Sequence, residues 1–133
     1  MQIQRGRLID HLHLKVRDLG ASRRFYGAVL GVLGIDITDG DGYFYADELW
    51  VDEGTPGQIS HAHFAFQAKD RETVDAFYKA GLAADGRDNG GPGERDYHPG
   101  YYAAFLLDPD GNNVEAVYHG PHQRSAEAVV VSW

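Results

Sequence analysis

Two pairs of histidines stand near the starts of two similar stretches of this 133-residue chain. His11 and His13 form the first pair, and His61 and His63 form the second. Residues two apart on a β-strand lie on the same face, so each pair would present two imidazoles to one side of its strand. Imidazole nitrogen is a common ligand of divalent transition metals. The pattern therefore predicts a metal site made from two strands.

The stretches around these histidines repeat at an offset of 52 residues. Asp18 follows His11 after seven residues, Asp70 follows His63 after seven, and a Phe-Tyr pair follows each aspartate after seven more. A repeat of this kind indicates two copies of one structural module. Because the offset matches His11 with His63, we expect these two residues to be equivalent ligands of one ion.

A carboxylate is expected to complete the ligand set, because two imidazoles leave an ion under-coordinated. Glu115 lies among apolar residues in the stretch N-V-E-A-V-Y, where an acidic side chain is costly unless it is paired or coordinated. Aligning the hairpins of the two modules places Asp52 opposite Glu115, either as a further ligand or as a base. Two histidines and a carboxylate suit iron(II), and they also accept manganese, nickel, cobalt or zinc. We expect one divalent ion, of a metal that the ligand types leave open.

Apolar periodicity predicts the same order of elements in both modules, a strand, a helix and a hairpin of short strands. Module 8–53 is expected to contain a strand at 8–17, a helix from about residue 22 to Gly31, and strands at 43–46 and 49–52. Module 59–119 is expected to contain a strand at 59–68, a helix at 71–81, and strands at 101–107 and 114–119. The tail 120–133 is either an additional strand or an ordered arm. The two modules and the tail are expected to make one domain, residues 1–133.

Composition excludes several classes of protein. The formal net charge of −8 leaves no basic face for phosphates, so no nucleic-acid partner is expected. The negative charge either keeps the protein soluble or attracts cationic ligands. No apolar run approaches the roughly 20 residues that cross a bilayer, so no membrane partner is expected either. The absence of cysteine restricts metal ligands to nitrogen and oxygen. The N-terminus lacks the features of a signal peptide, which predicts a cytoplasmic protein.

The segment 88–102, which leads towards Glu115, has four glycines and two prolines and is expected to be a loop. We expect it to form a wall over the metal, with Tyr97, His98 and Tyr102 reaching the cavity and Tyr101 pointing away by strand alternation. With Trp50 they would make an aromatic pocket for a small-molecule substrate. An ordinary aromatic-anchored loop is the alternative.

Three motifs in order resemble the vicinal oxygen chelate superfamily, which includes glyoxalase I, bleomycin-resistance proteins, extradiol dioxygenases and fosfomycin-resistance thiol transferases. They are I-D-H-L-H-L-K-V-R-D-L-G-A-S-R-R-F-Y, H-F-A-F-Q-A-K-D and F-L-L-D-P-D-G-N-N-V-E-A, and the resemblance covers roughly residues 8–118. It implies an α+β fold in which two βαβββ modules form curled mixed sheets around a central metal site. Carried over by position, the implied metal ligands are His11, His63 and Glu115.

The resemblance implies a metal-dependent enzyme acting on a small oxygen-chelating substrate, most readily a lyase or isomerase of glyoxalase type. Glu115, Asp52, His13 and His61 are then the candidate catalytic groups. Glyoxalase I has a glutamate where this chain has Asp52, and bleomycin-binding members lack the ligands that are present here. An antibiotic- or metabolite-binding resistance protein, a dioxygenase and a thiol transferase are the alternatives. The two modules could close within one chain or across a homodimer.

Overall fold

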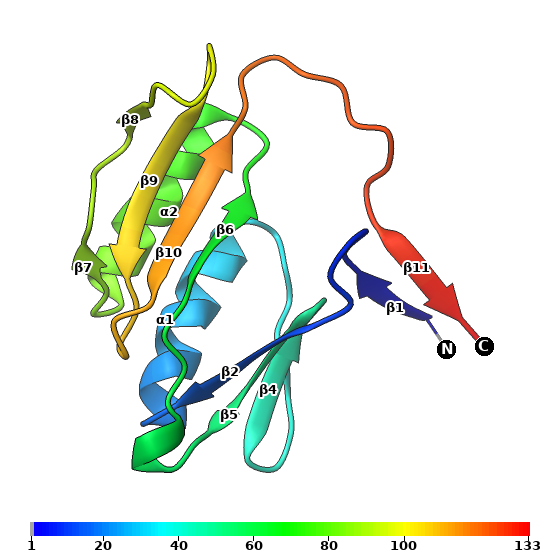
Figure 1. Ribbon diagram of the computed structural model, residues 1–133, viewed down its shortest axis with the longest axis vertical. Helices are drawn as coiled ribbons and strands as arrows, with labels where there is room; N and C mark the ends of the chain where they lie inside the picture. Colours follow the sequence, from blue (N-terminus) through cyan, green and yellow to red (C-terminus); the bar gives the residue numbers. More distant parts are fainter. Residues whose placement is uncertain (1) are drawn as a thin grey trace.

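The structure is a computed structural model that describes residues 2–133 (Figure 1). The first module forms a four-stranded sheet of order β2-β5-β4-β3, in which β2 runs parallel to β5. Its elements are β2 (Leu12–Val16), α1 (Leu19–Val32), β3 (Thr38–Asp39), β4 (Tyr43–Ala46) and β5 (Leu49–Glu53). A short 3-10 helix, η1 (Pro56–Gln58), leads into the second module.

The second module repeats this plan in a five-stranded sheet of order β6-β10-β9-β7, with β8 also paired to β9. Its elements are β6 (His63–Gln67), α2 (Arg71–Ala83), β7 (Arg87–Asp88), β8 (Gly93–Glu94), β9 (Tyr102–Leu107) and β10 (Asn113–Tyr118). Strand β6 runs parallel to β10, as β2 does to β5. The predicted α+β architecture of two similar modules is confirmed, with mixed sheets on one side of a helix pair.

The two aspartates of the sequence repeat are helix N-caps. The side chain of Asp18 accepts a hydrogen bond from Ala21 N at 3.0 Å, and that of Asp70 accepts one from Thr73 N at 2.7 Å. Such caps satisfy backbone donors that the first helical turn leaves unpaired. Helix α1 therefore begins at Leu19, and Ser22, which the sequence placed at or near the start of the helix, lies early in it.

Helices α1 and α2 pack against each other and against the inner faces of both sheets. Phe25 and Phe77, one from each Phe-Tyr pair, are fully buried in this core. Gly81 allows the helices and β9 to approach closely, because a Cβ there would lie 2.2 Å from Leu106 Cδ1 and 3.2 Å from Val29 Cγ1. Neither helix is long and apolar enough to cross a membrane, among residues 2–133.

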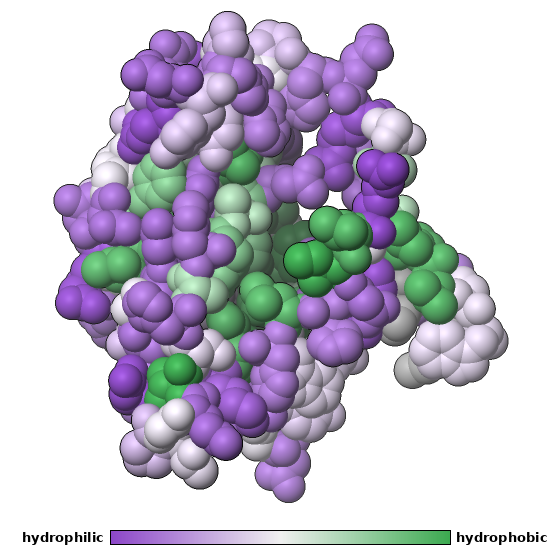
Figure 2. Space-filling model, in the orientation of Figure 1, coloured by the Kyte–Doolittle hydropathy of each residue, from purple (hydrophilic) through white to green (hydrophobic). Residues whose placement is uncertain are grey.

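The chain ends form a separate antiparallel ribbon of β1 (Gln2–Arg5) and β11 (Val129–Ser132), which stands off the two modules (Figure 1). The tail thus contains an additional strand, which pairs with the start of the chain and with neither module sheet. Hydrophobic residues gather over this ribbon in Figure 2, and the side chains of Val129, Val130 and Val131 are exposed.

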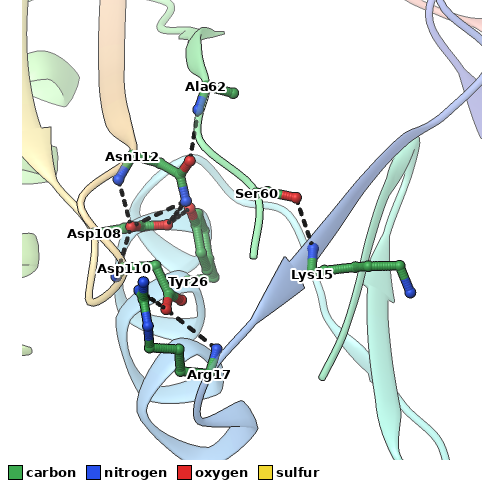
Figure 3. A network of polar contacts seen from close by, with 8 residues as sticks. All are labelled: Lys15, Arg17, Tyr26, Ser60, Ala62, Asp108, Asp110 and Asn112. Carbon is green, nitrogen blue, oxygen red and sulfur yellow. Dashed lines mark hydrogen bonds and ion pairs between the residues drawn. The ribbon is translucent and has the colours of Figure 1, made fainter. Parts of the chain in front are cut away.

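A buried carboxylate joins the two modules (Figure 3). Asp108, fully buried after β9, accepts a hydrogen bond at Oδ2 from Tyr26 Oη of α1, at 2.5 Å. Its Oδ1 accepts bonds from the backbone N–H groups of Asp110 and Asn112, both at 2.9 Å. Asn112 Oδ1 in turn accepts a bond from Ala62 N at 2.7 Å, just before β6. The D-P-D-G-N-N turn is therefore tied both to α1 and to the start of β6.

Two further contacts of this network fix the end of β2 (Figure 3). Arg17 donates to Asp110 Oδ1 from its backbone N at 3.2 Å and from Nη1 at 3.0 Å. Lys15 N donates to Ser60 Oγ at 2.9 Å, and Ser60 N donates to Lys15 O at 2.9 Å. Strand β2, which carries His13, and strand β6, which carries His63, are thus held by these neighbouring contacts.

Replacing Tyr26 by Phe removes one donor from a buried carboxylate, so we expect the free energy of unfolding to fall by about 1–3 kcal/mol. Tyr78→Phe is the matched control, because its Oη donates to Asp88 at the surface (2.9 Å) and its loss should cost less than about 1 kcal/mol. Urea unfolding followed by circular dichroism measures both. Equal destabilisation in the two variants would contradict a special role for the Asp108 network.

Candidate functional site

His63 and Glu115 form a histidine–carboxylate pair on the second sheet. His63 Nε2 lies 2.9 Å from Glu115 Oε1. The neighbours of Glu115 in β10, Val114 and Ala116, belong to the core beneath the helices, so Glu115 projects from the opposite face. The Glu115 side chain is only 4% exposed, whereas that of His63 is 54% exposed. The buried acid expected from the sequence is therefore paired, and its partner is open to solvent.

Tyr101 holds the second oxygen of this carboxylate, because its Oη donates to Glu115 Oε2. Burial and then this hydrogen bond raise the pKa of Tyr101 well above its ordinary value, so it stays a donor at neutral pH. Tyr102 turns the other way and donates to Asp75 Oδ1 of α2 at 2.6 Å. The expectation that Tyr102 reaches the cavity while Tyr101 points away is corrected. Because β9 pairs Phe105 with Glu115, the side chain four residues earlier, Tyr101, lies on the face of Glu115.

Histidines surround Tyr101. His98 Nε2 lies 2.8 Å from His119 Nδ1, the two rings are stacked with centroids 5.1 Å apart, and both meet Tyr101 edge-on. Tyr97 packs edge-on against Tyr101 at 4.9 Å and is 70% exposed. His98 and Tyr97 thus contact Tyr101, which in turn is hydrogen-bonded to Glu115.

His119 and Tyr101 were missed as site residues by the sequence reasoning. The signal for His119 was present, since it ends the stretch N-V-E-A-V-Y-H and lies four residues after Glu115. Burial lowers the pKa of His119, and the neighbouring His98 and His122 lower it further, against an opposing effect of Glu115. His119 is therefore a neutral imidazole at neutral pH and can accept a proton.

His13 and Asp52 form a second histidine–carboxylate pair, on the first sheet. His13 Nε2 lies 2.7 Å from Asp52 Oδ1, and Lys15 Nζ lies 3.8 Å from the same oxygen. Burial opposes the ionisation of Asp52, but contacts with His13 and Lys15 outweigh it, and the pKa of Asp52 is lowered. Trp50, also on β5, is stacked beside Tyr43 and Tyr45, with ring centroids 4.3 and 5.7 Å away. This carboxylate is thus ionised beside an aromatic surface.

The two pairs occupy the same position in the register of their sheets. Asp52 is paired across the parallel strands with Lys15, two residues after His13. Glu115 is paired with Ala65, two residues after His63. The register therefore matches His13 with His63, whereas the 52-residue offset matched His11 with His63.

His11 precedes β2 and its Nδ1 lies 2.8 Å from Asp10 Oδ1, while His61 is exposed in the segment before β6. Among residues 2–133, no group of three or more His, Asp or Glu side chains is placed to hold a metal ion. The structure thus brings His63 together with Glu115, and His13 with Asp52, but it does not bring His11 to His63 and Glu115 within one chain. We call His13 with Asp52 the first half-site, and His63 with Glu115 the second half-site.

The fold agrees with comparisons to known proteins. Residues 8–116 match the model of the Glyoxalase/Bleomycin resistance protein/Dioxygenase superfamily. The chain belongs to this superfamily. The protein PA2024 of Pseudomonas aeruginosa, whose name describes it as uncharacterized, is 30% identical over 92% of this chain and 96% of its own length.

Solved structures show the same relationship. A glyoxalase/bleomycin resistance protein from Albidiferax ferrireducens T118 is 32% identical, with a TM-score of 0.70 over 83% of this chain and 97% of that one. Lactoylglutathione lyase from Agrobacterium tumefaciens has a TM-score of 0.58 over 80% of this chain and 90% of that one. At 21% identity this second likeness shows the shared fold alone.

The histidine cluster gives a prediction for pH titration. His98→Ala should raise the pKa of His119, because the substitution removes both burial and a like charge from that imidazole. Following the imidazole proton signals by NMR between pH 4 and 9 measures this shift, and His61→Ala, at an exposed position outside the cluster, is the control. A pKa of His119 that stays unchanged or falls in His98→Ala would contradict the observed stacking.

Proposed function

We propose that this protein is a divalent-metal-dependent enzyme that acts on a small oxygen-chelating substrate, as a lyase or isomerase of glyoxalase type. The observation that carries the proposal is the pair of half-sites, each a histidine beside a carboxylate at the same register position. His63 and Glu115 are the proposed ligands from the second module. The first module supplies a histidine, which is His11 by the sequence repeat and His13 by the strand register.

The side chains fit a metal by type and by spacing. Imidazole nitrogen and carboxylate oxygen are ligands of zinc, iron, manganese, nickel and cobalt. Two ligand atoms at about 2.0–2.2 Å from one ion lie roughly 3 Å apart when they are near right angles. The observed separations of 2.9 Å in the second half-site and 2.7 Å in the first are close to this value. Each half-site therefore offers two donors of the right kind.

A complete ligand set needs both half-sites, and the structure favours two copies of the chain as their source. Closing the two half-sites within one chain would move the modules relative to each other. The Asp108 network opposes that movement, because Tyr26 and Ala62 bind the same turn from different modules. In a homodimer the first half-site of one copy can meet the second half-site of the other without breaking this network.

The residues around the half-sites support proton transfer next to a chelated substrate. A divalent ion bound there supplies Lewis-acid polarisation of the substrate oxygens. Tyr101 holds Glu115 Oε2, which directs Oε1 towards His63. Asp52 holds the ring of His13 in place. His119, neutral and close to Tyr101, can accept a proton on the other side. The same arrangement would also serve a dioxygenase or a thiol transferase of this superfamily.

Glu115→Gln and His63→Ala should each lose most of the bound metal while keeping the fold, because each substitution removes one proposed ligand. The measurement is zinc, nickel, manganese, iron and cobalt content after purification without added metal, with calorimetric titration of the apoprotein. His61→Ala, at an exposed position, should retain wild-type binding. Comparing His11→Ala with His13→Ala identifies the ligand from the first module.

Tyr101→Phe tests a side chain that orients the proposed ligand Glu115 without binding the metal itself. Metal affinity should fall by about 10–100-fold, less than in Glu115→Gln, because only the hydrogen bond to Oε2 is lost. Tyr97→Phe is the control, since that ring contacts Tyr101 at the exposed surface. Wild-type metal affinity in Glu115→Gln and His63→Ala would overturn the proposed ligand set.

A further inference from the structure

A cavity of about 740 Å³ lies between the first module and the ribbon of β1 and β11. One wall is formed by Tyr45, Leu49 and Trp50 of the first sheet, and the other by residues of β1 together with Trp133, which follows β11. His11 and His13 also line it, so the cavity opens onto the first half-site. Its volume falls within the range of about 300–1,000 Å³ that is usual for sites of small organic ligands.

The aromatic wall is flat and ordered. Trp50 and Tyr45 are stacked with an interplanar angle of 5°, and Tyr43 is stacked against Trp50 at 13° and lies beside Tyr45 at 17°. Trp133, the residue after β11, is 73% exposed. Flat rings held in parallel offer a surface on which another planar ring can stack, and their faces attract cations.

The charged groups around this wall are mainly acidic. Asp36, Asp47 and Glu48 line the cavity, and Arg5 is the one Lys or Arg among the lining residues of the described chain. Arg5 already donates to Asp47 O at 2.7 Å and lies 3.5 Å from Asp10 Oδ1. Burial raises the pKa of both Asp47 and Glu48, and the charge of Arg5 acts against this rise in each. The cavity therefore presents more negative charge than its own cation neutralises.

We propose that this cavity binds planar organic cations, with the ring stacked against Trp50 and the positive charge near Asp47 and Glu48. This inference rests on the proposed function and deepens it, because the cavity opens onto His13 and so assigns the organic part of the substrate a place beside the metal ligands. The net charge of −8 favours the approach of the same class of ligand.

Fluorescence anisotropy with two tricyclic dyes tests the proposal. Proflavine is planar and cationic at neutral pH, and acridone has a similar ring system without charge. With metal-free protein in the presence of a chelator, proflavine should bind at least about tenfold more tightly than acridone, and its affinity should fall as salt rises. The two tryptophans of the chain both line the cavity, so their emission should change on binding with the same midpoint.

Three variants locate the site. Trp50→Ala and the double variant Asp47→Asn/Glu48→Gln should each weaken proflavine binding at least about tenfold. The charge-matched control Asp41→Asn/Glu72→Gln removes two exposed carboxylates outside the cavity and should bind as the wild type does. Circular dichroism verifies that each variant is folded.

Equal affinity for the two dyes, or wild-type proflavine binding in both cavity variants, would overturn the inference. Because the measurement uses metal-free protein, its result is independent of the metal-retention series. Loss of metal binding in Glu115→Gln together with unselective dye binding would leave the proposed function intact and refute the cationic pocket alone.

Discussion

The carboxylate of Asp108 is buried between the two modules, and its hydrogen bonds determine how they are joined. A charge removed from water is tolerated only when donors surround it, and here Tyr26, Asn112 and the backbone of the turn supply them. Because Tyr26 comes from α1 and Asn112 binds the segment before β6, the turn sets the position of one module against the other. The glycine of this turn, Gly111, has a φ of 87°, a conformation that other residues rarely adopt.

This junction explains why the two half-sites stay on separate sheets. Each sheet turns its apolar face to the helices and its histidine–carboxylate pair to the opposite side. The histidines of the pairs are therefore exposed at positions where a second copy of the chain, or a substrate, can reach them. Burial of Glu115 beneath Tyr101, with His63 left open, gives a site that is fixed on one side and accessible on the other.

Much of the fold followed from sequence because its local signals agreed with one another. The strand and helix periodicity, the repeated aspartates and the D-P-D-G turn all predicted the order of elements that the structure contains. Glu115 was selected from the sequence as a candidate site residue because an acidic side chain among apolar residues is costly unless it is paired or coordinated. The repeat and the strand register differ at one point, because the repeat carries the helix caps Asp18 and Asp70 at the same offset of 52 residues and so matches His11 with His63. The strand register instead places His13 where His63 stands, because β2 begins after His11 while β6 begins at His63.

The side-chain directions beyond β9 could not be predicted in the same way. Strand alternation was counted from a strand beginning at residue 101, but the face of Tyr101 depends on the register of the β9–β10 hairpin, which pairs Phe105 with Glu115. The ribbon of β1 and β11 is a pairing between the two ends of the chain, which no local pattern encodes. The sequence therefore identified the histidines and carboxylates of the half-sites as candidates. Only the structure shows which histidine lies beside which carboxylate.

The claim that two copies of the chain share each metal site is tested most directly by mixing two variants that do not bind metal on their own. One carries His11→Ala and His13→Ala, and the other carries His63→Ala and Glu115→Gln, so that each lacks one half-site. If the sites form between copies, unfolding and refolding the two together restores metal binding to about a quarter of the sites, since half of the dimers are mixed and each has one intact site. No restored binding in the mixture, while wild-type protein treated in the same way recovers, would contradict the account.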